Sequence, residues 1–354
     1  MIILNIELNN IYGFNDFKMN LTYPKKIVNS IIEDEHLAGR ERFRYKKAVV
    51  LMGANASGKT SLGKALRNIF AMMELDFRID PYSMVNNKNP GSFCIDFVNE
   101  DYVLRRVEGR IDSKIKLATY HYYRAAIDKN DSYETCVRKL VRDNEYEGHM
   151  IRSRFAYPDI SPELRFEGVN EKTMLKTLKA VIGTLDPTLK NIVRSKDLKD
   201  SYIIKRDDQE IIIQNGKLLN TEVLSSGTAE GIEVAIMLAS IIDGKETFYY
   251  CDEHFSYIHS DIEKRIFGIM LEHLGDNEQL IFTTHNTDML DLNLPKHSYC
   301  FLKKEKVGNR YEVSVRYASD YLKRNTDSVR CAVENDLFGS IPDDSLLDSL
   351  EIDS

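Results

Sequence analysis

Cysteine is scarce in this sequence, and a long apolar run is missing altogether. The 354 residues include five scattered cysteines with no Cys-x-x-Cys pair, which argues against a zinc site and favours a reducing compartment. No stretch approaches the roughly 18 apolar residues that a membrane-spanning helix needs. The start, Met1–Ile6, lacks the basic segment and the small-residue cleavage site of a signal peptide. We therefore expect a cytoplasmic protein without a membrane segment, and its hydrophobic fraction of 43% is sufficient for a core.

A broad positive surface is also missing, since the formal net charge is −7. This balance argues against a nucleic-acid footprint over the whole surface. Local basic clusters do occur, at Arg40, Arg42, Arg44, Lys46 and Lys47 and again at Arg152 and Arg154. Such clusters are more often solvated loops than binding sites, so contact with nucleic acid stays open as the minor alternative.

Against these absences stands a complete phosphate-binding loop at residues 53–60, Gly-Ala-Asn-Ala-Ser-Gly-Lys-Thr. It follows the apolar run Ala48–Met52 and leads into a helical pattern, which is the strand–loop–helix context that GxxxxGK[ST] requires. In this motif we expect Lys59 to reach the β- and γ-phosphates and the Thr60 hydroxyl to bind Mg²⁺. The alternative is a chance glycine-rich turn. The predicted nucleotide-contacting residues are Gly53, Asn55, Ala56, Ser57, Gly58, Lys59, Thr60 and Ser61.

Two further apolar strands end in residues that suit a nucleotide site. Residues 247–251 are followed by Asp252 and Glu253, an arrangement in which Asp252 holds Mg²⁺ and Glu253 acts as general base toward water. Residues 280–284 are followed by His285, which is placed to bond the γ-phosphate. A lone histidine after a strand is more often structural, and that alternative is weakened here by the neighbouring acidic pair.

A short polar segment, Leu224-Ser225-Ser226-Gly227-Thr228, stands at the start of a predicted helix, shortly before the acidic pair. It resembles the LSGGQ signature of ABC-type ATPases. Hydroxyl and N–H groups at a helix N-terminus form a good anion site, so Ser225, Ser226 and Gly227 are predicted to contact nucleotide. The alternative is an ordinary serine cap with Glu230 supporting the first helical turn.

The rest of the chain has α/β texture, and we divide it into ranges 1–123, 124–199, 200–330 and 331–354. The first range carries the phosphate loop, the second is predicted to be a helical insertion and possible partner surface, and the third carries the other site motifs. Within the first range, residues 24–47 are predicted to form a loop or short helix. The last range is a tail with five acidic residues after position 342, interpreted as a partner segment or, more simply, as a frayed terminus.

The expected secondary structure alternates between strands and helices. Strand pairs are expected within 2–23 and at 92–98 with 102–107, and a further strand at 114–123. Helices are expected at 59–75, 227–243 and 262–274, a hairpin at 202–214, and strands at 247–251 and 279–283.

The order of these motifs resembles that of the ABC ATPase superfamily, and in particular its standalone members with SMC-like and RecF-like heads. Met52–Thr60 is similar to the GANASGKS loop of small bacterial ATPases from phage-defence and abortive-infection loci. Asn335–Pro342 resembles the GxFGAIP ending of the same group. The resemblance covers most of the chain apart from 124–199. It implies an α/β P-loop NTPase of ABC-ATPase type, a mixed sheet core with N-terminal antiparallel strands, and a helical insertion.

The resemblance also implies an assembly. ATP with Mg²⁺ would lie between two copies of the chain, in a homodimer or higher homo-oligomer. Lys59, Thr60, Asp252, Glu253 and His285 would act from one copy, and Ser225 and Gly227 from the other. The D-loop, residues 254–261, would cross the interface. Two departures from the family pattern bear on hydrolysis. The signature ends in Thr228, and no glutamine precedes Gln209, so either an Asn, Asp or Ser within 83–101 replaces the Q-loop glutamine or that link is absent.

The function expected from this reading is an ATPase that acts as a slow, nucleotide-dependent dimerisation switch and controls a separate effector, a nuclease or toxin, in anti-phage defence. The main alternative is an SMC/RecF-like ATPase of DNA repair or DNA-end processing, which predicts a long coiled coil or a basic face that the sequence lacks. A transporter subunit is disfavoured by the missing glutamine. A nuclease site within the chain would have to use residues such as His121, His149 and Arg152, which form no recognisable pattern.

Overall fold

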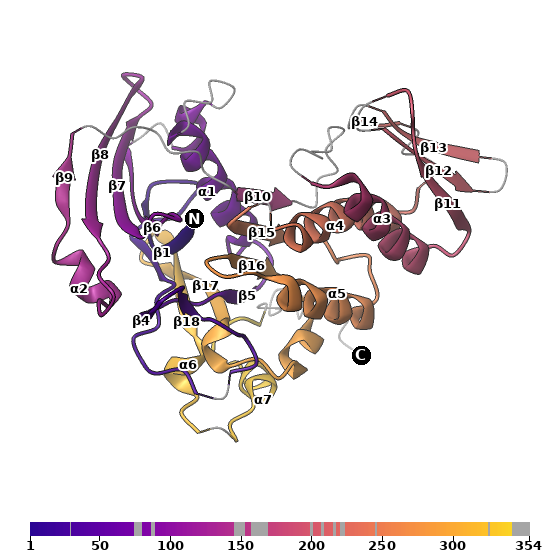
Figure 1. Ribbon diagram of the computed structural model, residues 1–354. Helices are drawn as coiled ribbons and strands as arrows, with labels where there is room; N and C mark the ends of the chain where they lie inside the picture. Colours follow the sequence, from indigo (N-terminus) through magenta and orange to yellow (C-terminus); the bar gives the residue numbers. More distant parts are fainter. Residues whose placement is uncertain are drawn as a thin grey trace, which may run out of the picture.

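The structure is a computed structural model, and it describes residues 1–28, 30–73, 80–85, 89–144, 153–156, 169–198, 201–206, 209–214, 217–219, 224–244, 246–324 and 326–341. Three parts lie side by side (Figure 1): an antiparallel sheet from the N-terminal region, a central sheet with helices, and a smaller unit formed by α3 and β11–β14. No helix of the described residues combines the length and the apolar character needed to cross a membrane.

The central sheet has six strands in the order β10-β15-β16-β5-β17-β18. Its core is parallel: β5 (Ala48–Met52), β15 (Phe248–Asp252) and β16 (Gln279–Thr283) are buried along their whole length. β10 (Ser153–Ala156) extends the parallel set beside β15, and β17 (Tyr299–Val307) runs parallel to β5 and antiparallel to β18 (Arg310–Tyr317). The carboxyl ends of parallel strands meet at one edge, so the segments after β5, β15 and β16 converge there.

Helices cover both faces of this sheet because successive strand residues point to opposite sides. Val49 and Leu51 face one side and share a core with α1 (Lys59–Met73). Val50 and Met52 face the other side, where they pack with α4 (Ser226–Ile242) and α5 (Ser260–His273). This two-sided burial explains why each of the three central strands has a continuous apolar stretch, at residues 48–52, 248–251 and 280–282.

The N-terminal region forms a second six-stranded sheet, entirely antiparallel, in the order β2-β1-β6-β7-β8-β9. Its strands are β1 (Ile2–Asn9), β2 (Phe17–Asn20), β6 (Gly91–Val98), β7 (Val103–Asp112), β8 (Leu117–Ala126) and β9 (Val141–Asp143). The strand pairs expected at 2–23 and 92–107 are confirmed. The strand expected at 114–123 begins later, at Leu117, because residues 113–116 form the turn after β7. The predicted α/β class with N-terminal antiparallel strands is therefore confirmed.

The region 124–199 contains more β-structure than expected. It holds the long helix α3 (Glu171–Leu185) and a short α2 (Tyr133–Val137), but also the end of β8, the whole of β9 and β10, and β11 (Leu189–Arg194). The expected helical insertion is therefore only partly helical: β9 and β11 pair with the neighbouring strands β8 and β12, and β10 pairs with the distant β15. The division of the chain into four ranges stays a prediction.

Beside α3 lies a four-stranded antiparallel sheet of β11, β12 (Tyr202–Arg206), β13 (Gln209–Gln214) and β14 (Lys217–Leu218). β12 and β13 confirm the hairpin expected at 202–214. α3 packs against α4, and Leu185 lies where a side chain at Gly231 of α4 would be. This unit therefore reaches the nucleotide-site half of the molecule through α4.

Residues 24–47 also differ from the expected loop or short helix. They contain β3 (His36–Leu37) and β4 (Arg40–Arg44). Lys46 and Lys47 are buried: the Lys46 ammonium donates to the Asn20 carbonyl at 2.9 Å, and that of Lys47 to the Glu33 carbonyl at 3.0 Å. These two lysines brace the chain, so the sequence cluster is not one continuous basic surface. Arg152 lies outside the described residues.

The C-terminal part of the described chain contains α6 (Ala318–Tyr321) and α7 (Val329–Glu334). Short 3₁₀ helices of the described residues lie at Pro81–Met84, Thr287–Asp291 and Lys296–Ser298. Phe338, from the segment that resembles the GxFGAIP ending, is fully buried and stacks on Phe301 of β17, with ring centroids 4.1 Å apart. The motif thus anchors the end of the described chain to the central sheet. The acidic residues after position 342 lie outside the described part.

Candidate nucleotide-binding site

The phosphate loop after β5 has the backbone geometry that its sequence predicts. Gly53 and Gly58 have φ values of +156° and +113°, and Ala56 has +60°. A Cβ at Gly53 would lie 2.6 Å from the Leu302 carbonyl oxygen, so only glycine fits between the loop and β17. Where residues with positive φ alternate with residues of negative φ in a tight loop, the backbone N–H groups point toward a common centre, and such loops bind phosphate there.

Lys59 lies at the start of α1 and is almost fully buried. Its ammonium donates to the carbonyls of Gly53 at 2.8 Å and Ala54 at 3.2 Å, and it lies 3.2 Å from the Glu253 carboxylate. Burial lowers the pKa of Lys59, and the Glu253 charge opposes that shift. The Lys59 ammonium is thus held inside the loop by two carbonyls and a carboxylate, and the phosphates of a nucleotide would take the place of these acceptors.

Asp252, at the end of β15, has a geometry that suits Mg²⁺. One oxygen, Oδ1, accepts a bond from the Thr283 hydroxyl at 2.7 Å. The other, Oδ2, is buried and has no hydrogen-bond partner among the described residues. Burial raises the pKa of Asp252, whereas the hydroxyls of Thr60 and Thr283 lower it. Mg²⁺ prefers oxygen ligands, and phosphates and water usually complete its coordination shell. The unpaired carboxylate oxygen of Asp252 and the hydroxyl of Thr60 are ligands of this kind.

Glu253 is the next residue and has a left-handed backbone, with φ of +48°. A non-glycine residue in this region is held there by its surroundings, and such positions gather at functional sites. Its carboxylate contacts His285 Nε2 at 2.9 Å as well as Lys59. Burial raises the pKa of Glu253, but His285 and Lys59 together outweigh it, so the net pKa is lowered and the carboxylate is ionised at neutral pH.

The loop that carries His285 is held by a carboxylate that the sequence did not single out. Glu263 of α5 is buried, and it accepts hydrogen bonds from the Thr284 hydroxyl at 2.7 Å and the Asn286 amide at 2.6 Å. Burial raises the pKa of Glu263, and these two donors oppose the shift. In sequence Glu263 is only an acidic residue in the first turn of a helix, so no signal distinguished it.

These groups border a cleft of about 480 Å³ that we call the phosphate pocket. Its lining is shared by the phosphate loop, the D-loop, α5 and the His285 loop, and comprises Asn55, Glu253, Phe255, Ser256, Ile258, Ser260, Glu263, Thr284, His285 and Asn286. Lys59 and Asp252 adjoin it through Glu253. Residues predicted from three separate sequence motifs therefore meet at one edge of the sheet.

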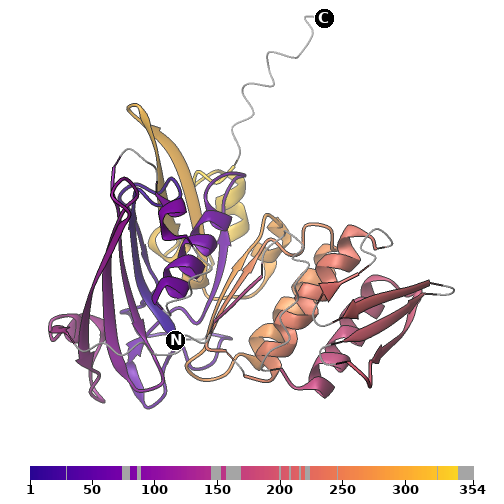
Figure 2. The ribbon, with the colours of Figure 1, turned by 90° about the horizontal axis from the view of Figure 1, so that it is seen from above.

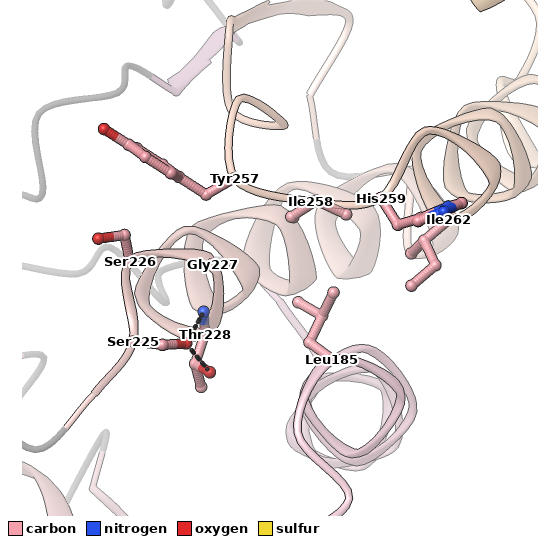
Figure 3. Close-up of a pocket in the computed structure, with 9 residues that line it drawn as sticks. All are labelled: Leu185, Ser225, Ser226, Gly227, Thr228, Tyr257, Ile258, His259 and Ile262. Carbon is pink, nitrogen blue, oxygen red and sulfur yellow. Dashed lines mark hydrogen bonds between the residues drawn. The ribbon is translucent and has the colours of Figure 1, made fainter.

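The signature residues lie in a second cleft, of about 430 Å³, which we call the signature pocket. It is lined by Leu185, Ser225, Ser226, Gly227, Thr228, Tyr257, Ile258, His259 and Ile262. Figure 3 shows the start of α4 with the D-loop above it and Leu185 of α3 opposite. Within one chain, the two pockets share only Ile258 of the D-loop among their lining residues.

At the start of α4 the two serines have different surroundings. The Ser225 hydroxyl accepts a bond from the Thr228 N–H at 3.2 Å and so caps the helix, as the simpler reading expected. Glu230 does not support that first turn, because its carboxylate accepts the Tyr257 N–H of the D-loop at 3.2 Å. Ser226 is exposed, and its hydroxyl points away from the helix (Figure 3).

The expected replacement for a Q-loop glutamine is not apparent at the two aspartates of 83–101. Asp96 is fully buried and accepts two bonds from Arg106, at 2.7 and 2.8 Å, and one from the Tyr133 hydroxyl. Asp101 is paired with Arg105. Both therefore support the N-terminal sheet. His121, named as a possible nuclease residue, lies exposed on β8 beside Arg142, and the described residues contain no cluster of His, Cys, Asp and Glu suited to a metal. His149 lies outside the described residues.

Comparison with known proteins identifies the family. Residues 48–291 match the model described as "AAA domain, putative AbiEii toxin, Type IV TA system". The chain belongs to this family. This AAA domain spans the phosphate loop, the signature, the acidic pair and His285, so membership implies nucleotide binding and confirms the resemblance found in the sequence. No curated protein matches the sequence.

Solved structures with the same fold include an SMC head bound to the C-terminal winged-helix domain of ScpA. It is 13% identical, with 92% of this chain and 100% of that chain covered and a TM-score of 0.53. An SMC head domain from Thermotoga maritima (12% identity, 88% and 98% coverage, TM-score 0.44) and the recombination mediator RecF (12%, 88% and 97%, 0.45) also match. The first of these matches shows that the chain has the fold of an SMC head.

Proposed function

We propose that this AAA domain hydrolyses ATP and that nucleotide joins two copies of the chain. The observation that carries the proposal is the separation of the two pockets. Ser226 and Gly227 border a cleft of their own, with the D-loop between them and the phosphate pocket. A site completed by a second copy gives these residues a ligand, and it suits an isologous dimer in which each copy supplies both halves.

Binding of ATP would begin with an exchange of partners at Lys59. Its ammonium is bonded to loop carbonyls and to Glu253. The β- and γ-phosphates offer stronger, charged acceptors in the same position. Thr60 and Asp252 are the residues that would hold Mg²⁺, which when bound neutralises charge on the phosphates.

Hydrolysis would use Glu253 as general base toward a water molecule positioned at the γ-phosphate. When Lys59 moves to the phosphates, Glu253 loses one of the two cations that lower its pKa, while burial continues to raise it. Its basicity would therefore increase on nucleotide binding. His285 would stay within reach of both the carboxylate and the γ-phosphate, and Glu263 would position it through Thr284 and Asn286.

For the biological role, we propose a switch that controls a separate toxic effector in anti-phage defence. The family description, a putative AbiEii toxin of a type IV toxin–antitoxin system, supports a defence setting. The second candidate is an SMC- or RecF-like role on DNA. The fold is compatible with it, but the burial of Lys46 and Lys47 removes part of the basic cluster on which it depended. DNA binding that falls steeply with salt would favour that candidate.

Mixing two inactive variants tests the composite site. Lys59→Ala inactivates the phosphate half, and Gly227→Val inactivates the signature half. Each variant alone should show no ATPase activity, whereas an equal mixture should recover part of the wild-type rate, because a mixed dimer holds one intact composite site. A mixture as inactive as its components would overturn the shared site, and a fully active Gly227→Val variant would remove the signature from the mechanism.

A further inference from the structure

The β17–β18 hairpin extends beyond the edge of the sheet at which nucleotide is expected. β17 pairs with β5 only as far as Phe301 opposite Met52, where β5 ends and the phosphate loop begins. β17 and β18 then continue as a two-stranded ribbon to Val307 and Arg310. Figure 2 shows this orange-yellow ribbon projecting from the body of the molecule. The ribbon starts in contact with the loop, since the Leu302 carbonyl lies against Gly53.

One face of the ribbon carries cations and an aromatic ring. Leu302 belongs to the core on the α1 side of the sheet, so with a repeat of two the side chains of Lys304 and Lys306 share that face. Tyr311 is paired with Lys306 and lies on the same face. The Lys304 ammonium donates to the Ala56 carbonyl of the phosphate loop at 3.3 Å and lies 5.5 Å from the Tyr311 ring centroid.

This face of the ribbon and the predicted catalytic residues lie on opposite sides of β5. Asp252, Glu253 and His285 come from β15 and β16, on one side of β5. In the proposed ATP site they would hold the γ-phosphate end of a nucleotide on that side. The ribose and base would then lead away from these strands, and β17–β18 is the neighbour of β5 on the other side. Tyr311 is 58% exposed there, which leaves its ring open to a ligand.

We propose that this ribbon face binds the nucleoside half of the nucleotide. The Tyr311 ring stacks on the purine base, and the Lys304 ammonium turns from the Ala56 carbonyl to the ribose and α-phosphate. Aromatic stacking on a base contributes through the ring face, and a lysine beside the ring strengthens the charge complementarity with phosphate. The inference rests on the proposed ATP binding and adds to it the residues that distinguish a nucleotide from bare polyphosphate.

The test compares ATP with inorganic tripolyphosphate, both with Mg²⁺, by calorimetric titration of the full chain. Tyr311→Ala should weaken ATP about tenfold and leave tripolyphosphate unchanged, because the latter has no base to stack. Tyr311→Phe should restore ATP affinity, which separates stacking from loss of the hydroxyl. Lys304→Ala should weaken ATP severalfold more than tripolyphosphate. Arg310→Ala is the matched control, since Arg310 lies on the opposite face of the ribbon and should leave both affinities unchanged.

The outcomes are distinguishable from failure of the proposed function. Wild-type protein that binds neither ligand would overturn nucleotide binding itself. Wild-type protein that binds ATP, with Tyr311→Ala binding it equally well, would overturn only the role of the ribbon. Equal weakening of both ligands by Lys304→Ala would mean that this lysine braces the phosphate loop. A thermal melt of each variant checks that the ribbon substitutions leave the fold intact.

Discussion

In the phosphate pocket, charged groups already have partners within the chain: Lys59 is bonded to loop carbonyls, and Glu253 to Lys59 and His285. In the signature pocket, Ser226 is exposed at the start of α4 and Tyr257 of the D-loop is 71% exposed. The charged groups of the phosphate pocket are thus paired within the chain, whereas these residues of the signature pocket are exposed to a ligand or a second copy of the chain. By the proposed mechanism, nucleotide would displace contacts in the phosphate pocket and supply contacts in the signature pocket.

The largest effect is expected from removing the Lys59 ammonium beside the phosphate pocket. Lys59→Ala should weaken ATP binding at least about 100-fold, since the β- and γ-phosphates lose their main charged contact. Titration with ATP and Mg²⁺ measures the effect. Lys179→Ala, an exposed lysine on α3, is the control and should bind as wild type. Near-normal affinity of Lys59→Ala would contradict the assignment of the loop.

The signature pocket can be altered at a residue that does not line the phosphate pocket. A Cβ at Gly227 would lie 2.8 Å from the Tyr257 carbonyl oxygen, so Gly227→Ala must displace the D-loop from α4. We expect at least about tenfold weaker ATP-dependent association and a smaller change in the ATP affinity of the single chain, since the D-loop borders both pockets whereas Gly227 lines only one. Sedimentation at several protein concentrations measures association. A parallel loss of ATP binding would show that the two pockets are not independent.

The D-loop between the pockets contains a buried histidine whose stability contribution depends on pH. Both ring nitrogens of His254 lack a hydrogen-bond partner among the described residues, and burial lowers its pKa to about 4. The unfolded chain binds the proton near pH 6.5, so stability is complete above that pH and falls toward pH 4. Urea unfolding should show about 2 kcal/mol lost between pH 7.5 and pH 5 from this residue.

His254→Leu removes the titrating group and keeps an apolar side chain at the site. Its stability should fall less than that of the wild type over the same pH interval. Identical pH profiles for the two proteins would contradict the buried, neutral state of His254.

The smallest expected effect is on stability, and it is seen when a glycine of α1 and a glycine of α3 are each replaced by alanine. A Cβ at Gly63 of α1 would lie 2.5 Å from the Tyr250 ring, whereas one at Gly183 of α3 would meet nothing within 4 Å. Gly63→Ala should therefore destabilise by about 1–2 kcal/mol through overpacking, and Gly183→Ala should stabilise by about 0.5–1 kcal/mol through helix propensity. Thermal melts measure both. Stabilisation by both substitutions would contradict the close packing of α1 on β15.

The parts of this molecule that sequence could predict are those with strong local patterns. Ala48–Met52 is uniformly apolar, Gln279–Thr283 has an apolar centre at Leu280, Ile281 and Phe282, and both form strands with the expected bounds. The phosphate loop, the acidic pair and His285 follow such strands, so the common edge of a parallel sheet brought them together. The position of each residue was thus predictable once the strands were placed side by side.

Other features depended on contacts between distant segments. β10 was missed because four residues in a polar region form a strand only by pairing with β15. Lys46 and Lys47 looked like surface charges, yet carbonyls of Asn20 and Glu33 hold them inside. Lys304 likewise lies in an alternating charged run that is typical of a solvated hairpin, and only its contact with Ala56 distinguishes it.

The most direct measurement is the mass of the protein in solution by light scattering, for wild type and Glu253→Gln, with and without ATP and Mg²⁺. We expect that ATP doubles the mass, that Glu253→Gln traps the larger species because it binds ATP without hydrolysing it, and that Lys59→Ala never forms it. A mass that stays at one chain under every condition, with ATP bound, would contradict the composite site and the trans role of Ser225, Ser226 and Gly227.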